Sequence, residues 1–150
     1  MAKRKVFKIS KESETIEVKY NTKETFEDLK GTSEYGFTPE IGVEDYEVDE
    51  ADGAIQHQQT TWNGKLDFKT MGYKDDEFQS FLVEVAEGIK RGDDNSIDIK
   101  KVNHINGKTY TYEDCIISDV TVVNGKVNEL CAISWTAQTN GYPIEEEAQG

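Results

Sequence analysis

The chain has few of the residues from which catalytic and metal sites are built. Its 150 residues include two cysteines and two histidines, at Cys115, Cys131, His57 and His104. Zinc sites need Cys and His clustered at short spacings, and these four are scattered. No serine lies in a Gly-x-Ser-x-Gly turn that would expose it as a nucleophile. We therefore predict that the chain is not an enzyme, with no catalytic residue, no metal ligand and no cofactor.

The two cysteines are expected to be free thiols, because the chain carries no export signal. Both lie in 112–136, a stretch that we interpret as a hairpin about the Asn-Gly pair at 124–125. A two-residue turn would place Cys115 opposite Ser134, and a three-residue turn would place it opposite Trp135. In both registers the cysteines lie farther apart than the ~7 Å Cα separation that a disulfide allows.

Long hydrophobic runs are also missing. No run approaches the roughly 18 apolar residues of a membrane helix. The first residues, MAKRKVFKIS, are basic and have neither an apolar core nor a cleavage site of small residues. We expect no membrane span, and a chain that is made in a cytoplasm and not exported by the general route.

Basic residues are outnumbered, with 17 Lys and Arg against 30 Asp and Glu and a formal charge of −13. This sign disfavours adhesion to nucleic acid or to an anionic membrane, since both need a positive face. Aromatic residues make up 10% of the chain, which favours a folded core over disorder. The length suits a single domain over 1–150.

Asn-Gly pairs predict the main architecture, because a tight hairpin turn needs positive φ at both central residues. Such pairs at 63–64, 106–107 and 124–125 are each flanked by strand-like runs. RKVFKIS and ETIEVKY form a further expected hairpin near the N-terminus. We therefore predict a mainly β chain with an antiparallel, meander-like sheet.

One segment breaks the β pattern. Over 75–91, apolar residues recur at helical spacing, which predicts an amphipathic helix that starts at Asp75 and is terminated by Gly92. Its apolar face contains Phe78, Phe81, Leu82, Val85, Ala86 and Ile89. A second, shorter helix over 21–30 is one interpretation of NTKETFEDLK, and irregular structure is the other.

The segment 31–52 is expected to be a long acidic loop. No Lys or Arg occurs from Gly31 to Asn63, whereas eight acidic residues do. Long loops of this kind are usually functional or mobile. A solvated loop and a partner-contacting arm both fit. In the second interpretation the candidate inter-subunit contacts are Tyr35, Phe37, Ile41, Val43, Tyr46 and Val48. The polar end, 143–150, is expected to form a short flexible tail.

The order of these elements resembles that of tail tube proteins of long-tailed bacteriophages and of phage-tail-like bacteriocins. The likeness covers about 53–138. The segments that carry it are GYKDDEFQSFLVEVAEGI, which looks like the family's single helix, and DNSIDIKKV, KTYTYEDCIISDVTV and VNELCAISWTAQ, which look like its later strands.

The resemblance implies a β-sandwich protomer, two packed antiparallel sheets flanked by a helix, and a structural role. Six protomers would form a ring whose inner sheets join into a continuous β-barrel, and rings would stack into a tube of the virion tail, assembled in the host bacterial cytoplasm. The segment 31–52 would reach between neighbours. Implied partners are further copies of the chain, the tape measure, the tail terminator and the distal tail or baseplate proteins. DNA would pass without specific binding, because a negative lumen repels phosphates, and no membrane is involved.

The same charge supports an alternative, a monomeric acidic β-sandwich that binds a ligand or acts as a DNA-mimic inhibitor. An oligomeric tube subunit and a monomeric binding module differ in their state of association, which the composition leaves open.

Overall fold

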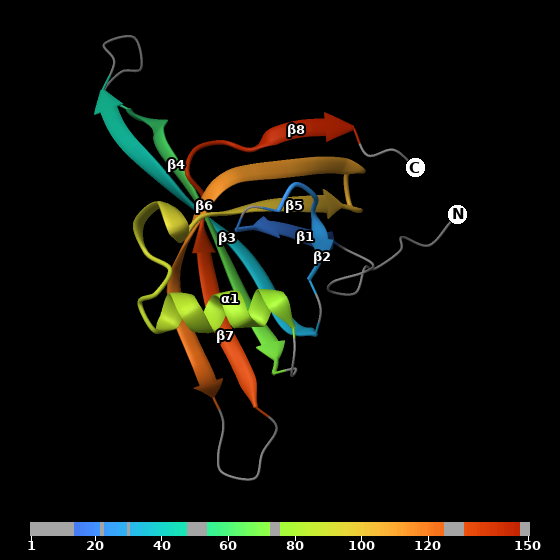
Figure 1. Ribbon diagram of the computed structural model, residues 1–150. Helices are drawn as coiled ribbons and strands as arrows, with labels where there is room; N and C mark the ends of the chain where they lie inside the picture. The colour runs from blue at the N-terminus through green and yellow to red at the C-terminus, as the bar shows by residue number, and fades with distance from the viewer. Residues whose placement is uncertain are drawn as a thin grey trace.

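The computed structural model describes residues 14–21, 23–29, 31–47, 54–72, 76–124 and 131–147 (Figure 1). The elements in chain order are β1 (Glu14–Tyr20), β2 (Glu27–Asp28), β3 (Thr32–Glu47), β4 (Ile55–Met71), α1 (Glu77–Ala86), the 3-10 turn η2 (Gly92–Asp94), β5 (Ile97–Asn103), β6 (Lys108–Asn124), β7 (Ala132–Gln138) and β8 (Ile144–Glu147). This confirms the prediction of a mainly β fold with one α-helix. No helix among the described residues is long and apolar enough to cross a membrane.

Strand β6 belongs to two sheets. Its first half pairs with β5 on one side and with β8 on the other, in sheet A, which has the order β2-β1-β5-β6-β8. Its second half pairs with β7 in sheet B, which has the order β6-β7-β4-β3. All of these pairings are antiparallel, so each strand presents alternate side chains to the two faces of its sheet.

The core lies on one face of sheet B. Rows of paired residues cross the sheet there, and one row contains Tyr35, Phe68, Trp135 and Val120. Phe68 stacks on Trp135 with ring centroids 4.1 Å apart. The Trp135 indole N–H donates a 3.2 Å hydrogen bond to the Thr70 hydroxyl, so its one polar atom is satisfied inside the core.

Helix α1 covers this core but is shorter than predicted. It starts after Asp76, whose carboxylate accepts the backbone N–H two residues further on at 3.0 Å. It ends at Ala86 because Gly88 adopts positive φ of 78°, where the sequence pattern had favoured Gly92 as the terminator. Ile89 is therefore outside the helix and 65% exposed.

The Asn-Gly pair at 63–64 is not a turn, so this prediction is wrong. It lies in the middle of β4, where Gly64 pairs with Pro39 and its N–H donates a 2.9 Å hydrogen bond to the Thr139 hydroxyl. A Cβ at Gly64 would lie 2.9 Å from the Thr139 side chain. Here glycine permits close approach of a neighbouring segment, its other common role inside a strand.

The pair at 106–107 does lie in a turn, with Gly107 at φ 72°. The turn is longer than two residues, because Asn103 pairs with Lys108. The pair at 124–125 and the strand RKVFKIS fall wholly or partly outside the described residues. Within them, β1 has β5 and β2 as its neighbours.

Both proposed registers of the 112–136 hairpin are wrong. Ser134 pairs with Thr121, whereas Cys115 pairs with Ile97 on β5. The error follows from the connection, since β6 ends at Asn124 and β7 begins at Ala132, which is too far apart for a two- or three-residue turn. The free state of the two thiols is nevertheless confirmed, with Cys115 buried and Cys131 exposed.

Two further predictions need correction. The acidic segment expected to be a loop over 31–52 is largely the strand β3, paired with β4 along its length. The expected flexible tail over 143–150 contains β8, which pairs with β6. In both cases backbone pairing with another strand overrides a polar local composition. Of the two interpretations of 21–30, the helix is absent from the described residues, which contain the short strand β2.

A buried ion pair joins sheet A to the base of β3. Lys101 is 2% exposed, and its ammonium lies 3.7 Å from the Glu14 carboxylate and 3.5 Å from the centroid of the Phe37 ring. Burial lowers the pKa of Lys101, an effect that Glu14 partly opposes. Burial, and then Glu14, raise the pKa of Tyr35. The cation therefore lies between an anion and an aromatic face, which together compensate part of its desolvation.

We expect Gly64→Ala to be strongly destabilising and Gly36→Ala to be nearly neutral. Alanine at 64 would collide with Thr139, which costs about 1–3 kcal/mol of unfolding free energy. At Gly36 no atom lies within 4 Å of the added Cβ. Urea unfolding of both variants measures the difference, and equal midpoints would contradict the close-approach role of Gly64.

A thiol reagent should titrate one cysteine in the native protein and two in denaturant. Burial raises the pKa of Cys115 from 9.0 to about 12, so its reactive thiolate is scarce at pH 8. Cys131 is exposed. Cys131→Ser should therefore abolish the native reaction, and persistence of a fast thiol in that variant would show that Cys115 is accessible.

Lys101→Met should cost about 3 kcal/mol, because it leaves the Glu14 carboxylate without its buried partner. The double variant Glu14→Leu/Lys101→Met should recover most of this loss, since well-packed apolar side chains can replace a buried pair. Chemical denaturation of the two single variants and the double variant gives the coupling energy. A coupling near zero would mean that the two charges act independently.

Candidate assembly surface

The β3–β4 hairpin extends beyond the rest of sheet B. Strand β4 pairs with β7 only from Lys65 to Met71, so its first half, 55–64, has β3 as its sheet partner. Figure 1 shows these two strands projecting at the upper left. We call residues 40–47 and 55–63 the hairpin arm.

Three exposed apolar side chains share one face of the arm. Ile41 and Val43 alternate along β3 on the side that continues the core face, and Ile55 lies opposite Glu47 on that same side. Their exposed fractions are 52%, 55% and 58%. Tyr46, 44% exposed, lies on the other face by the same alternation. The row Ile41, Val43 and Ile55 is the apolar stripe of the arm.

The geometry of the arm depends on local contacts between its strands. A Cβ at Gly42 would lie 1.9 Å from the Thr61 hydroxyl, so the strands approach closely at this point. The register shifts by one residue just beyond, where Val43 pairs with Gln59. Bulges of this kind bend a hairpin and increase its twist. Further out, the His57 imidazole contacts the Asp45 carboxylate across the strands.

The candidate contacts at the base of the arm serve the protomer itself. Tyr35 and Phe37 are partly buried against the core. The Tyr35 ring lies 5.1 Å from that of Phe68, and the Phe37 ring 6.1 Å from that of Tyr112. The structure therefore separates the six predicted residues: Ile41, Val43 and Tyr46 are exposed, Tyr35 and Phe37 face inward, and Val48 lies outside the described residues.

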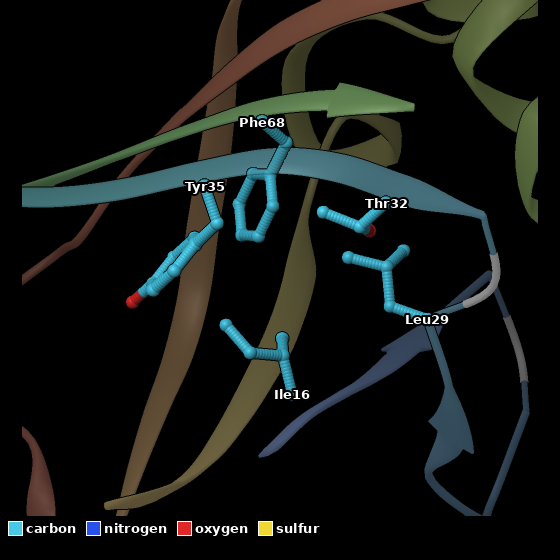
Figure 2. Close-up of a pocket in the computed structure, with 5 residues that line it drawn as sticks. All are labelled: Ile16, Leu29, Thr32, Tyr35 and Phe68. Carbon is cyan, nitrogen blue, oxygen red and sulfur yellow. The ribbon is translucent and has the colours of Figure 1, made fainter. Parts of the chain in front are cut away.

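A small cavity beside Tyr35 is the space left where the two sheets meet. Figure 2 shows it between Ile16 of β1 and Phe68 of β4, with Leu29 and Thr32 at its other side. Its volume is about 40 Å³, far below the several hundred Å³ of a typical ligand pocket. It has room for water and none for a substrate.

Sheet B has two edges that no described strand occupies. One is the outer edge of β3. The other is the edge of β6 beyond Cys115, where β5 stops. The Asn95 side chain satisfies the Ile117 backbone at the start of that edge, with hydrogen bonds of 2.9 and 3.3 Å. An unpaired edge of this length is a template for another strand.

The face of sheet B opposite the core is polar and mixed in charge. Its rows contain Glu34, Lys69, Ser134 and Thr121, then Gly36, Asp67, Thr136 and Asp119, then Thr38, Lys65, Gln138 and Ile116. Acidic residues outnumber lysines on it, with Glu40 in the next row. Thr136 donates a 2.6 Å hydrogen bond to Asp67, which orders the centre of the face.

The histidine, cysteine and acidic side chains are dispersed in the part of the chain that is described. No group of three His, Cys, Asp or Glu residues there could hold a metal ion. His104 bonds the Thr15 hydroxyl at 2.9 Å, and Cys115 donates to the Tyr112 carbonyl. Ile55 and the two open strand edges were not among the predicted contacts. The strand-like run that begins at Ile55 is the one local signal for that residue. The edges belong to β3 and β6 and depend on pairings between distant strands, which local sequence does not indicate.

The fold is shared with chains from several tail-like particles. No protein-family model matches the chain, and no curated protein matches it. A chain in the tail of an empty gene transfer agent particle with C6 symmetry aligns with a TM-score of 0.67 at 9% identity, covering 90% of this chain and 95% of that one. A chain in the cap of the anti-feeding prophage gives 0.64 at 9% identity, covering 99% and 95%.

A third structure extends the comparison to an extracellular contractile injection system. A chain of its PVC sheath–tube complex in the extended state aligns with a TM-score of 0.59 at 9% identity, covering 91% of this chain and 89% of that one. These likenesses extend over nearly the whole of each chain, although the sequences have diverged. They confirm, at the level of fold, the resemblance that the element order predicted: the chain has the fold of components of phage-tail-like particles.

Proposed function

We propose that the chain is a structural subunit of a phage-type tail tube, stacking as hexameric rings. The observation that carries the proposal is the open sheet B, four antiparallel strands with an unoccupied edge at each end. The shared fold supports it, since one aligned chain belongs to a tail with C6 symmetry.

The even strand count of sheet B is compatible with antiparallel pairing between copies in a ring. With four alternating strands, β3 and β6 run in opposite directions. A neighbour related by rotation about the ring axis then offers its β6 edge to the β3 edge in antiparallel orientation. Each copy uses both edges once, so a closed ring leaves no edge exposed.

The polar face of sheet B would line the lumen, because the other face is the protomer's core. Glu34, Asp67 and Asp119 would point into the channel. Lysines on the same face reduce the negative charge without reversing it. A weakly negative wall repels phosphates, which lets DNA slide without specific binding.

The apolar stripe of the arm would contact an adjacent copy, within a ring or between rings. Its three residues are about half exposed in the single chain and would lose water on assembly. Such a subunit would reside in the virion tail, be assembled in the host cytoplasm, and meet the tape measure, terminator and baseplate proteins at the ends of the tube.

The proposal is tested by negative-stain electron microscopy of the purified chain at high concentration. Rings or tubes are expected. Monomers alone, together with a discrete complex with a nucleic-acid-binding protein in size-exclusion chromatography, would instead support the acidic DNA-mimic alternative.

The contribution of the stripe is tested by Val43→Glu, with Gln58→Glu as its matched control. Both add one negative charge at exposed arm positions, but only Val43 lies on the apolar stripe. We expect Val43→Glu to reduce the tube fraction at least tenfold, as burying an unpaired charge costs several kcal/mol. Gln58→Glu should assemble as the unmodified chain does. Equal assembly of the two variants would remove the stripe from the interface.

A further inference from the structure

Strand β8 forms a short acidic edge of sheet A. It pairs through Ile144–Glu147 with the first residues of β6, and no described strand pairs with its opposite side. All four of its residues are exposed. Lys108 binds Glu145, which leaves Glu146 and Glu147 as the less compensated charges. Acidic side chains on an edge repel a second acidic strand and favour a basic one.

The N-terminal segment leaves the described structure at the same end of sheet A. One row of paired residues crosses the sheet there: Glu14 of β1, Asn103 of β5, Lys108 of β6 and Glu147 of β8. Figure 1 shows the start of β1 and the end of β8 on the same side of the molecule. The 13 residues before Glu14 could span at most about 45 Å.

These 13 residues have the opposite charge to the rest of the chain. They contain five of its 17 basic residues, namely Lys3, Arg4, Lys5, Lys8 and Lys11, and only one acidic residue. The run KVFKI combines β-branched and aromatic residues with lysines, a composition that favours an extended strand. The segment therefore complements the β8 edge both in charge and in the conformation that its sequence favours.

We propose that residues 3–9 of one copy bind as an added strand along the free edge of β8 in a second copy. Backbone hydrogen bonds would supply affinity and the charge pairs specificity, as in other cases of strand addition. The chain's own segment is less suited. It would have to pass β5, β6 and β8 to reach the far side of β8, about 19 Å for four strand spacings. It would then run parallel to β8, the less stable pairing.

This contact is separate from the proposed pairing of β3 with β6 of a neighbour and from the apolar stripe of the arm. It uses sheet A, whereas the β3–β6 pairing uses sheet B. It would link copies whether or not they also form rings, so it stands apart from the proposed function.

The test is disulfide trapping between chains that each carry one accessible cysteine, in a Cys131→Ser background. A chain with Val6→Cys is mixed with a differently tagged chain carrying Ile144→Cys, and Cys115 remains buried in both. A disulfide-linked heterodimer is expected at least tenfold above a control in which the second chain carries Ile89→Cys. Ile89 is 65% exposed and Ile144 48%, so exposure alone favours the control. Equal trapping in the two mixtures would overturn the proposal.

Charge reversal separates specific docking from collision. Glu146→Lys/Glu147→Lys in the Ile144→Cys chain should reduce trapping at least tenfold at low salt. Lys3→Glu/Lys5→Glu in the Val6→Cys chain should then restore it. Trapping that ignores both reversals would contradict the charge pairing. A chain carrying both cysteines that closes only on itself would overturn docking between copies.

These outcomes are distinct from those of the tube proposal. Tubes without trapping would reject the β8 contact and leave the tube intact. Trapping with monodisperse dimers and no tubes would support the β8 contact and reject the tube.

Discussion

The structure depends on the continuity of β6, which has to satisfy two sheets at once. Its first half takes β5 and β8 as partners and its second half takes β7. The change of partners brings the core face of sheet A, with Ile97 and Ile99, against that of sheet B, with Trp135. It also ends the pairing with β5 at Cys115, which leaves the rest of β6 as an open edge. One long strand thus creates both the core and the edge through which copies could join.

Besides the shared strand β6, an electrostatic contact also joins the two sheets. Lys101 and Glu14 belong to sheet A, and the Phe37 ring that faces the ammonium belongs to β3. The Tyr35 and Phe37 rings at the base of the arm are therefore partly buried within the protomer, which leaves less of their surface for a neighbouring copy. The arm becomes available for contact only beyond Pro39, where β4 no longer pairs with β7. The partial burial of the base of the arm and the exposure of its outer part both follow from the pairing of β4 with β7, which covers only Lys65 to Met71.

The fold could be predicted from the sequence where a local pattern determines the structure. The helix follows from apolar spacing, and the free thiols follow from the redox context of the chain. The predictions were wrong where a residue type has two uses. Gly64 allows close approach to Thr139 and makes no turn, and an acidic composition did not prevent β3 from pairing over 16 residues. Ile41, Val43 and Tyr46 were identified as exposed apolar candidates, but Tyr35 and Phe37 were not separable from them. That separation depends on Lys101, which is distant in sequence.

The acidic excess has a physical explanation in the same edges. A chain with open strands on both sheets is prone to uncontrolled strand pairing. Negative charge along β3 and β8 makes contact between two acidic edges of different copies electrostatically unfavourable. Contact of an acidic edge with a neutral or basic surface carries no such repulsion. In the proposed ring, antiparallel pairing of β3 with β6 would join an acidic strand to one of mixed composition, and rotation would close it. In that assembly the acidic charge would favour ordered association over aggregation.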